Sequence, residues 1–251
     1  MATLYGVGVG PGDPLLLTLK AYQLISTAPN VSYLANEQGR SQAAHIARQA
    51  FANVSCEQQH IAIPMPMSTD RTLANKAYDE GALQIAKQLD SGQDVVFLCE
   101  GDPLFFGSFS YLLERLAAQY TIEIVPGVSS VHAGAAALQL PLTLQRESFA
   151  IVSGRHSDEQ IHSALLSHDS LVIMKAGIAR PRILALLAQT NRLEHANYIE
   201  YISRDNQLIE RDVSQLAHSQ GPYFSLFVIT KKRFEHALNM PTQNTAVEDA
   251  Q

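Results

Sequence analysis

The sequence predicts an α/β protein built from two lobes. Short apolar runs of β type alternate with segments of helical periodicity along almost the whole chain, and Pro126-Gly127 interrupts this alternation near its midpoint. A length of 251 residues agrees with one large domain or two small ones. We therefore expect a first lobe over residues 1–125, a second over 126–235, and a loose polar tail over 236–251.

Composition excludes several classes of protein. Hydrophobic residues make up 46% of the chain and charged residues 17%, which predicts a proper core and excludes a disordered chain. The net charge of −6 would repel nucleic acid and anionic membranes, so neither is an expected partner. The longest stretch without charged residues, 124–145, contains prolines and glycines and does not resemble a membrane span. With no signal core at its start, the chain is expected to be cytoplasmic.

No metal site is expected either. The two cysteines, Cys56 and Cys99, form neither a disulfide framework nor a Cys-x-x-Cys pair. None of the nine histidines stands in a metal-binding spacing such as His-Glu-x-x-His.

The first lobe is expected to begin with a strand at 3–9 and a glycine-rich turn. A helix over 14–28 follows, because Asp13 suits an N-cap and Pro14 the first helical position. The remaining elements expected in this lobe are helices over 40–52, 72–89 and 108–118, and strands over 94–99 and 121–125.

The second lobe is expected to begin with an alanine-rich helix over 128–138. The alternation then predicts strands over 149–153, 170–174 and 198–202, and helices over 158–166 and 181–189. Two β-type runs, 207–213 and 223–230, end the fold, and the turn-like segment 219–222 between them suggests that they pair antiparallel.

The glycine-rich turn at residues 6–12 is the first candidate for ligand binding, because glycine lets a ligand approach the backbone closely. The dinucleotide spacing Gly-x-Gly-x-x-Gly fails, since Pro11 or Asp13 stands in the third glycine position. No Gly-Lys-Ser/Thr follows, and Pro11 lacks the amide that a phosphate cradle would use. The segment is therefore either a tight strand-to-helix turn or a ligand loop of another kind.

The second candidate follows the expected strand 94–99. Glu100 and Asp102 flank Gly101, and Phe105-Phe106 come next. Ligands of open α/β sheets bind beyond the carboxyl ends of strands. Carboxylates can bind hydroxyls or a cation, and a phenylalanine ring can cover a flat ring or a sulfonium. The alternative is that the acidic residues stabilise the dipole at a helix N-terminus.

The third candidate is Pro126-Gly127-Val128-Ser129-Ser130. The serines either cap the next helix or turn their hydroxyls and amides towards a ligand. No Gly-x-Ser-x-Gly motif is present, so the sequence gives no case for a serine nucleophile.

Basic residues are scattered rather than clustered. Arg180-Pro181-Arg182 is either a solvated helix start or part of a set of cations that clamps carboxylates. The other members of that set are Arg40, Arg71, Arg146, Arg155, Lys175 and Arg204.

Taken together, the motifs at 8–14, 100–103 and 126–130 resemble the tetrapyrrole methylase family, and the resemblance covers about Leu4 to Lys231. Within the family, three features are similar to the enzymes that methylate C20 of precorrin-2 or cobalt-factor II. The first is the motif at 8–14 continuing as Leu17-Thr18-Leu19-Lys20-Ala21, and the second is Gly39-Arg40-Ser41. The third is Glu100, in place of the family's usual glycine, together with Phe-Gly-Ser-Phe at 106–109.

The resemblance implies two α/β lobes with the active-site cleft between them, a homodimer, S-adenosylmethionine as methyl donor and a tetrapyrrole as substrate. The positions that match the family's cofactor contacts are Pro11, Glu100, Gly101, Asp102, Phe105, Ser129, Ser130, Met174, Ile202 and Ser225. No catalytic base is assigned. Candidates for the acceptor of the substrate proton are Glu100, Asp102, Tyr111 and Tyr201.

Three kinds of alternative stay open at this point. The first is another tetrapyrrole methylase, such as uroporphyrinogen III methyltransferase, or a family member acting on protein or rRNA. The second is a Rossmann-type oxidoreductase using NAD, against which the failed glycine spacing speaks. The third is a carrier that binds a tetrapyrrole or nucleotide without turnover.

Overall fold

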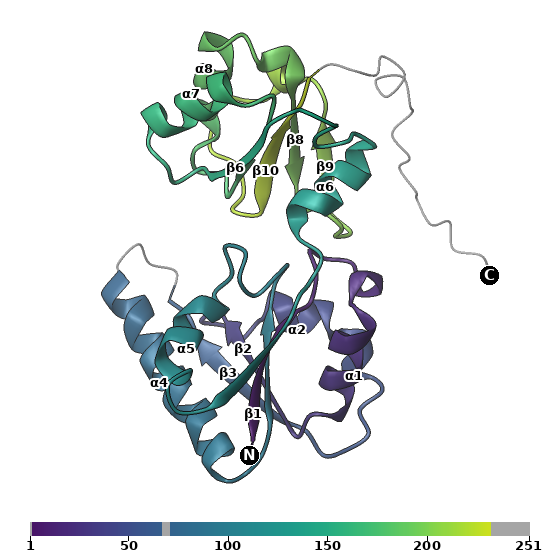
Figure 1. Ribbon diagram of the computed structural model, residues 1–251, viewed down its shortest axis with the longest axis vertical. Helices are drawn as coiled ribbons and strands as arrows, with labels where there is room; N and C mark the ends of the chain where they lie inside the picture. Colours follow the sequence, from purple (N-terminus) through teal and green to yellow (C-terminus); the bar gives the residue numbers. More distant parts are fainter. Residues whose placement is uncertain (1, 67–70, 232–251) are drawn as a thin grey trace, which may run out of the picture. The chain divides into compact units, whose positions relative to one another are not determined.

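The computed structural model describes residues 2–66 and 71–231, and these form two compact α/β units (Figure 1). The first unit runs to Ala133 and includes Ser203–Asp205, and the second comprises Gly134–Ile202 and the chain from Asn206 onward. The division lies inside a helix and not at Pro126, because Gly134 packs closely on side chains of the second sheet. The expected tail over 236–251 lies outside the described residues.

The first unit is built on a five-stranded sheet of order β3-β2-β4-β1-β5. Its strands are β1 (Thr3–Gly8), β2 (Asn30–Ala35), β3 (Gln59–Pro64), β4 (Val95–Cys99) and β5 (Thr121–Val125). Every neighbouring pair is parallel, so the carboxyl ends of all five strands lie at the same edge of the sheet.

Helices cover both faces of this sheet, with α1 and α2 on one side and α4 and α5 on the other (Figure 1). Successive side chains of β4 point to opposite faces, and both sets are apolar. Val96 and Leu98 pack towards α1 to α3, whereas Val95 and Phe97 pack towards α4 and α5, so both faces need a cover of helices. The helices are α1 (Leu19–Thr27), α2 (Gln42–Ile46), α3 (Arg48–Phe51), α4 (Arg71–Asp90) and α5 (Phe109–Leu116).

The helix expected over 14–28 is wrong as a single element. Asp13 does cap a turn, because its side chain accepts a hydrogen bond from the Leu15 amide, but that turn is a short 3-10 helix, Pro14–Leu16. Leu17 is extended (ψ 134°), and the Thr18 side chain then caps α1. The helix expected over 40–52 likewise divides into α2 and α3. Strands β2 and β3 were not predicted.

The second unit has a mixed sheet of order β6-β7-β10-β8-β9. Its strands are β6 (Phe149–Ser153), β7 (Ser170–Met174), β8 (Ala196–Glu200), β9 (Leu208–Glu210) and β10 (Ser225–Ile229). Strand β6 is parallel to β7, and β10 is antiparallel to both β7 and β8. The expected pairing of the last two β segments with each other is wrong, because β9 and β10 pair antiparallel with opposite sides of β8.

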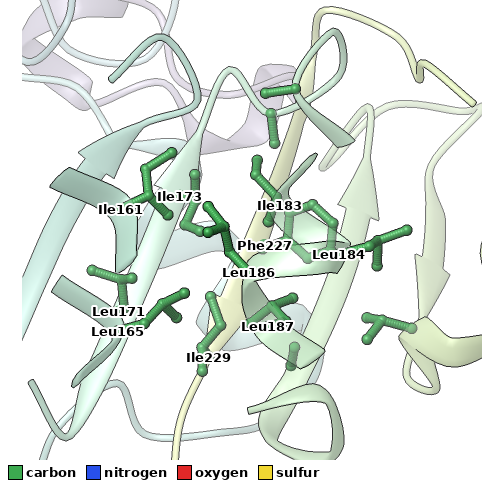
Figure 2. Packing of buried hydrophobic residues seen from close by; sticks show 14 of the residues in the cluster. Ile161, Leu165, Leu171, Ile173, Ile183, Leu184, Leu186, Leu187, Phe227 and Ile229 are labelled. Carbon is green, nitrogen blue, oxygen red and sulfur yellow. The ribbon is translucent and has the colours of Figure 1, made fainter. Parts of the chain in front are cut away.

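One face of this sheet carries the core shown in Figure 2, formed with α7 (Asp158–Ser167) and α8 (Arg180–Gln189). Phe227 and Ile229 of β10 point into this core. Leu226 and Val228, which alternate with them, lie against Gly134 of α6 (Ser130–Leu138). Helix α6 therefore covers the opposite face. Two short 3-10 helices, Leu193–His195 and Val213–Gln215, complete the unit.

Candidate functional site

The segments that follow β1 and β4 in the first unit are hydrogen-bonded to each other through their backbones. Gly10 and Gly101 form an isolated antiparallel bridge, with the Gly101 amide donating to Gly10 O (2.8 Å) and the Gly10 amide to Gly101 O (3.3 Å). The Val9 amide donates to Cys99 O (2.9 Å). The first two motifs singled out in the sequence therefore form one structure at the carboxyl edge of the sheet.

Glycines make this close approach possible. A Cβ atom added to Gly127 would lie 2.1 Å from the carbonyl oxygen of Gly101, and one added to Gly8 would lie 2.6 Å from the same oxygen. Both distances are far below van der Waals contact, so neither position accepts a side chain without moving backbone. Gly10 and Gly101 also have positive φ angles, 83° and 66°, which L side chains rarely adopt.

Asp102 joins the second and third segments. Its Oδ1 atom accepts a hydrogen bond from the Leu104 amide (2.9 Å), and its Oδ2 atom accepts one from the Gly127 amide (3.1 Å). Hydrogen bonds to a charged acceptor are stronger than those between neutral groups. The carboxylate therefore holds the segment after β4 against the segment after β5, a role that the sequence did not indicate.

The side chains around Asp102 are partly exposed and mostly apolar. Phe105 is half-buried and packs edge-to-face on Phe106, with ring centroids 5.1 Å apart. Phe106 (φ 53°) and Leu104 remain exposed. Burial raises the pKa of the neighbouring Cys99 thiol, so this cysteine is an inert core residue rather than a nucleophile.

Ser129 is buried and caps α6, because its hydroxyl oxygen accepts a hydrogen bond from the His132 amide (3.4 Å). The same hydroxyl lies 2.8 Å from His132 Nδ1. Ser130 is the first residue of α6 and is half-buried, and Pro11 is buried just beyond the Gly10–Gly101 bridge. The capping interpretation of the serines is thus confirmed for Ser129.

The other three predicted site residues lie along one edge of the second sheet. Strands β7 and β8 both run antiparallel to β10, so their carboxyl ends share an edge with its amino end. Met174 ends β7, Ile202 follows β8, and Ser225 begins β10. The Ser225 carbonyl accepts from the Ala176 amide (3.1 Å), and its hydroxyl donates to Pro222 O (2.8 Å).

Two further residues lie at the same edge. Lys175 and Tyr201 directly follow β7 and β8, and both have positive φ angles, 55° and 51°. A bulky residue with positive φ is a conformational outlier, and such outliers concentrate at functional sites. The sequence singles out Lys175 as a cation and Tyr201 as a proton acceptor, but it does not indicate their strained backbone, because the strain comes from the fold.

Arg180 is neither the solvated residue nor the free carboxylate clamp that the sequence left open. It is buried, pairs with Glu200 (3.3 Å) and donates from Nε to Ser219 O (2.8 Å). Its guanidinium lies over the ring of Tyr198, 5.5 Å from the centroid. Arg182 is likewise engaged, with Asp158. Both arginines stabilise the second unit.

Within the described ranges, no three His, Cys, Asp or Glu side chains are grouped so that they could hold a metal ion. Among the same residues, no helix combines the length and apolar character needed to cross a membrane.

Fold and site together define a two-unit α/β protein that presents glycine-rich and acidic loops at the carboxyl edge of a parallel sheet. The sequence pattern of the Tetrapyrrole (Corrin/Porphyrin) Methylases matches residues 3–217, and the chain belongs to this family. The family consists of S-adenosylmethionine-dependent methyltransferases, so the class of enzyme and its methyl donor are as predicted.

Two relatives resemble almost the whole chain. A precorrin-2 C(20)-methyltransferase of Sinorhizobium sp is 31% identical over 90% of this chain and 94% of its own length. A cobalt-precorrin-2 C(20)-methyltransferase of Salmonella typhimurium is 31% identical over 93% and 98%. The crystal structure of uroporphyrin-III C-methyl transferase from Thermus thermophilus, complexed with S-adenyl homocysteine, has a similar fold. It is 24% identical, covers 92% of this chain and 98% of that one, and has a TM-score of 0.66.

Gly127→Ala should lower the free energy of unfolding by about 1–3 kcal/mol, because the new methyl group collides with the Gly101 carbonyl. Gly134→Ala is a matched control. There the nearest atoms are flexible side-chain ends at 3.2 and 3.3 Å, and alanine favours a helix by about 1 kcal/mol. Urea unfolding of both variants measures their free energies of unfolding. Equal values would contradict the close approach of Gly127 to the Gly101 carbonyl.

Proposed function

We propose that this chain transfers a methyl group from S-adenosylmethionine to C20 of precorrin-2 or of its cobalt complex. The observation that carries the proposal is the likeness, over at least 90% of the chain, to two relatives named as C20-methyltransferases. The Glu100 loop and Gly39-Arg40-Ser41, which resemble the C20 enzymes, support it.

The residues of the first unit suit such a donor. Gly101 has open space where a Cβ would stand, with no atom within 4 Å, so a ligand can approach its backbone. Carboxylates and aromatic rings, as in Glu100, Asp102 and Phe105, are groups that stabilise a cation such as a sulfonium. Pro11 has no amide for a phosphate, which agrees with a donor that carries none.

S-adenosylmethionine supplies an electrophilic methyl group, and the protein's contribution is to place and surround it. The linked segments after β1, β4 and β5 give a preformed backbone surface that binds and orients the donor. Such orientation of reactants lowers the activation free energy by roughly 7–11 kcal/mol in favourable systems. The apolar side chains of Leu104 and Phe105 help to exclude water from a charge-dispersing transfer. Asp102, held by two amides, serves the geometry of the site rather than proton transfer.

Incubation of the purified protein with the methyl donor and precorrin-2, with or without cobalt, should give a product that carries one additional methyl group. Mass spectrometry counts the methyl groups and carbon-13 NMR locates them at C20. Uroporphyrinogen III is the control substrate and should remain unmethylated. Methylation of uroporphyrinogen III, or of another carbon of precorrin-2, would assign the chain to a different reaction of the family.

Asp102→Ala should raise the Kd for S-adenosylmethionine about tenfold or more, because two charge-assisted hydrogen bonds that shape the loops are lost. Asp102→Asn retains one acceptor oxygen and should fall between this variant and the wild type. Asp90→Ala, at the exposed end of α4, is the control for removing a carboxylate. Calorimetry measures the Kd for S-adenosylmethionine of the wild type and the three variants. Wild-type affinity in Asp102→Ala would show that the link between the loops is unnecessary for donor binding.

Arg40 is a cation placed to bind a substrate carboxylate. It follows β2 and therefore belongs to the same carboxyl edge as the Asp102 loop. The Asn36 side chain accepts hydrogen bonds from the Gln38 and Arg40 amides (3.1 and 2.9 Å), which fixes the loop. The Arg40 side chain is exposed, and within the part of the chain that the structure describes its guanidinium makes no hydrogen bond or ion pair. A tetrapyrrole with several carboxylates would supply the missing partner.

Arg40→Ala should raise the KM for the tetrapyrrole about three- to fivefold and leave the Kd for the methyl donor unchanged, because the lost contact is a partly solvated ion pair. Lys87→Ala removes the same charge from the last turn of α4, near the amino ends of the strands, and should change neither constant. Steady-state kinetics and calorimetry separate the two effects. An unchanged KM would exclude Arg40 from substrate binding.

The homodimer and the cytoplasmic location belong to this proposal as well. The dimer is supported by the resemblance to the family.

A further inference from the structure

The hydroxyl of Ser129 is bonded to an imidazole of the same helix turn. Ser129 Oγ lies 2.8 Å from Nδ1 of His132 and 3.4 Å from the His132 backbone nitrogen, which donates to it. Ser129 is 7% exposed, whereas His132 is exposed. A helix cap needs only the oxygen and the amide, so the contact with the imidazole is additional to capping.

The direction of this hydrogen bond follows from the inventory of donors and acceptors. The His132 amide already occupies one lone pair of Ser129 Oγ, and the hydroxyl proton needs an acceptor. The described residues offer this proton no acceptor other than Nδ1. An almost buried hydroxyl proton without a partner would be destabilising. This pairing requires the tautomer of His132 that carries its proton on Nε2, in which Nδ1 accepts the hydroxyl proton.

We propose that His132 is a positioning residue that makes Ser129 a hydrogen-bond acceptor towards the methyl donor. This inference rests on the proposed function, in which Ser129 is one of the contacts with S-adenosylmethionine. With its proton held by Nδ1, Ser129 Oγ presents its remaining lone pair, which suits a hydroxyl or ammonium group of the ligand.

The neighbouring serine has a different character. Ser130 makes no side-chain hydrogen bond with any residue that the structure describes, so its hydroxyl keeps both its proton and its lone pairs for a ligand. Ser129 presents an acceptor only, and Ser130 can present a donor or an acceptor. The pair therefore discriminates between donor and acceptor groups of a ligand. Two identical residues in the sequence give no indication of this difference.

A nucleophilic role for the Ser129–His132 pair does not fit the proposed reaction. There the methyl group passes from the donor to a carbon of the tetrapyrrole, so a serine nucleophile has no step to perform. The exposed member is His132, whose Nδ1 is already occupied. Orientation of a hydroxyl is the chemistry that this arrangement supports.

Two substitutions of His132 separate its effect on the orientation of the Ser129 hydroxyl from the effect of the size of its ring. In His132→Asn, the amide oxygen takes the place of Nδ1 and can still accept the Ser129 proton. In His132→Phe, a ring of similar shape remains but the acceptor is lost. We expect His132→Phe to raise the Kd for S-adenosylhomocysteine and the KM for S-adenosylmethionine about fivefold. His132→Asn should stay within about twofold of the wild type, and kcat and the tetrapyrrole KM should change by less than about twofold in both variants.

Ser129→Ala completes a double-mutant cycle. If His132 acts through the Ser129 hydroxyl, Ser129→Ala should weaken donor binding about as much as His132→Phe, and the double variant should be no weaker than either single one. Thermal unfolding followed by circular dichroism checks that each variant is folded. His132 is exposed, so its substitution leaves the core intact.

The outcomes separate this inference from the proposed function. Failure of the wild-type protein to bind either S-adenosylmethionine or S-adenosylhomocysteine would refute both. Wild-type binding with unchanged affinity in His132→Phe would refute only the role of His132. Additive losses in the double variant, or an equal loss in His132→Asn, would do the same, because His132 would then act independently of the Ser129 hydroxyl.

Discussion

The site of the first unit depends on direct contact between the backbones of three chain segments. Gly8 and Gly127 leave no room for a Cβ beside the Gly101 carbonyl, so the ends of β1 and β5 approach the segment after β4 more closely than any side chain allows. The Gly10–Gly101 bridge and the bond from the Gly127 amide to Asp102 both follow from this approach. The motifs that are separated in sequence thus form a single backbone surface.

This arrangement changes the role of the polar residues at the edge. The sequence suggests that acidic and hydroxyl side chains face a ligand, but part of their bonding capacity is used within the protein. Both carboxylate oxygens of Asp102 accept backbone amides, and the Ser129 hydroxyl is engaged with His132. In the proposed function, recognition of the methyl donor by these loops relies on oriented backbone and fixed hydroxyls, which would retain their geometry without reorganisation when the donor binds.

The sequence predicted the elements whose side chains are most uniformly apolar, such as β7, and missed β2 and β3. Strand β2 contains Asn30 and Ser32, which are buried only because they find partners: Ser32 Oγ donates to Ile61 O, and Asn30 to Asp94 O. Such pairing requires the neighbouring strands, so periodicity along one segment does not reveal it. The same reasoning applies to β10, whose place between β7 and β8 is set by tertiary packing rather than by the preceding turn.

The sequence left the role of the arginines open for a related reason, and the contacts of Arg180 in the structure bear on substrate binding. A guanidinium can form hydrogen bonds and ion pairs either within the protein or with a ligand, and its surroundings in the folded structure decide which. Arg180 is occupied by Glu200 and by carbonyl oxygens of the loop before β10. Arg192 donates to the carbonyl oxygens of Leu165, in the last turn of α7, and of Asp169, just after it. Bound cations of this kind have no capacity for a substrate carboxylate. In a chain of net charge −6, substrate anions must therefore be attracted locally, by exposed cations on rigid loops, and Arg40 on its Asn36-braced turn is such a cation.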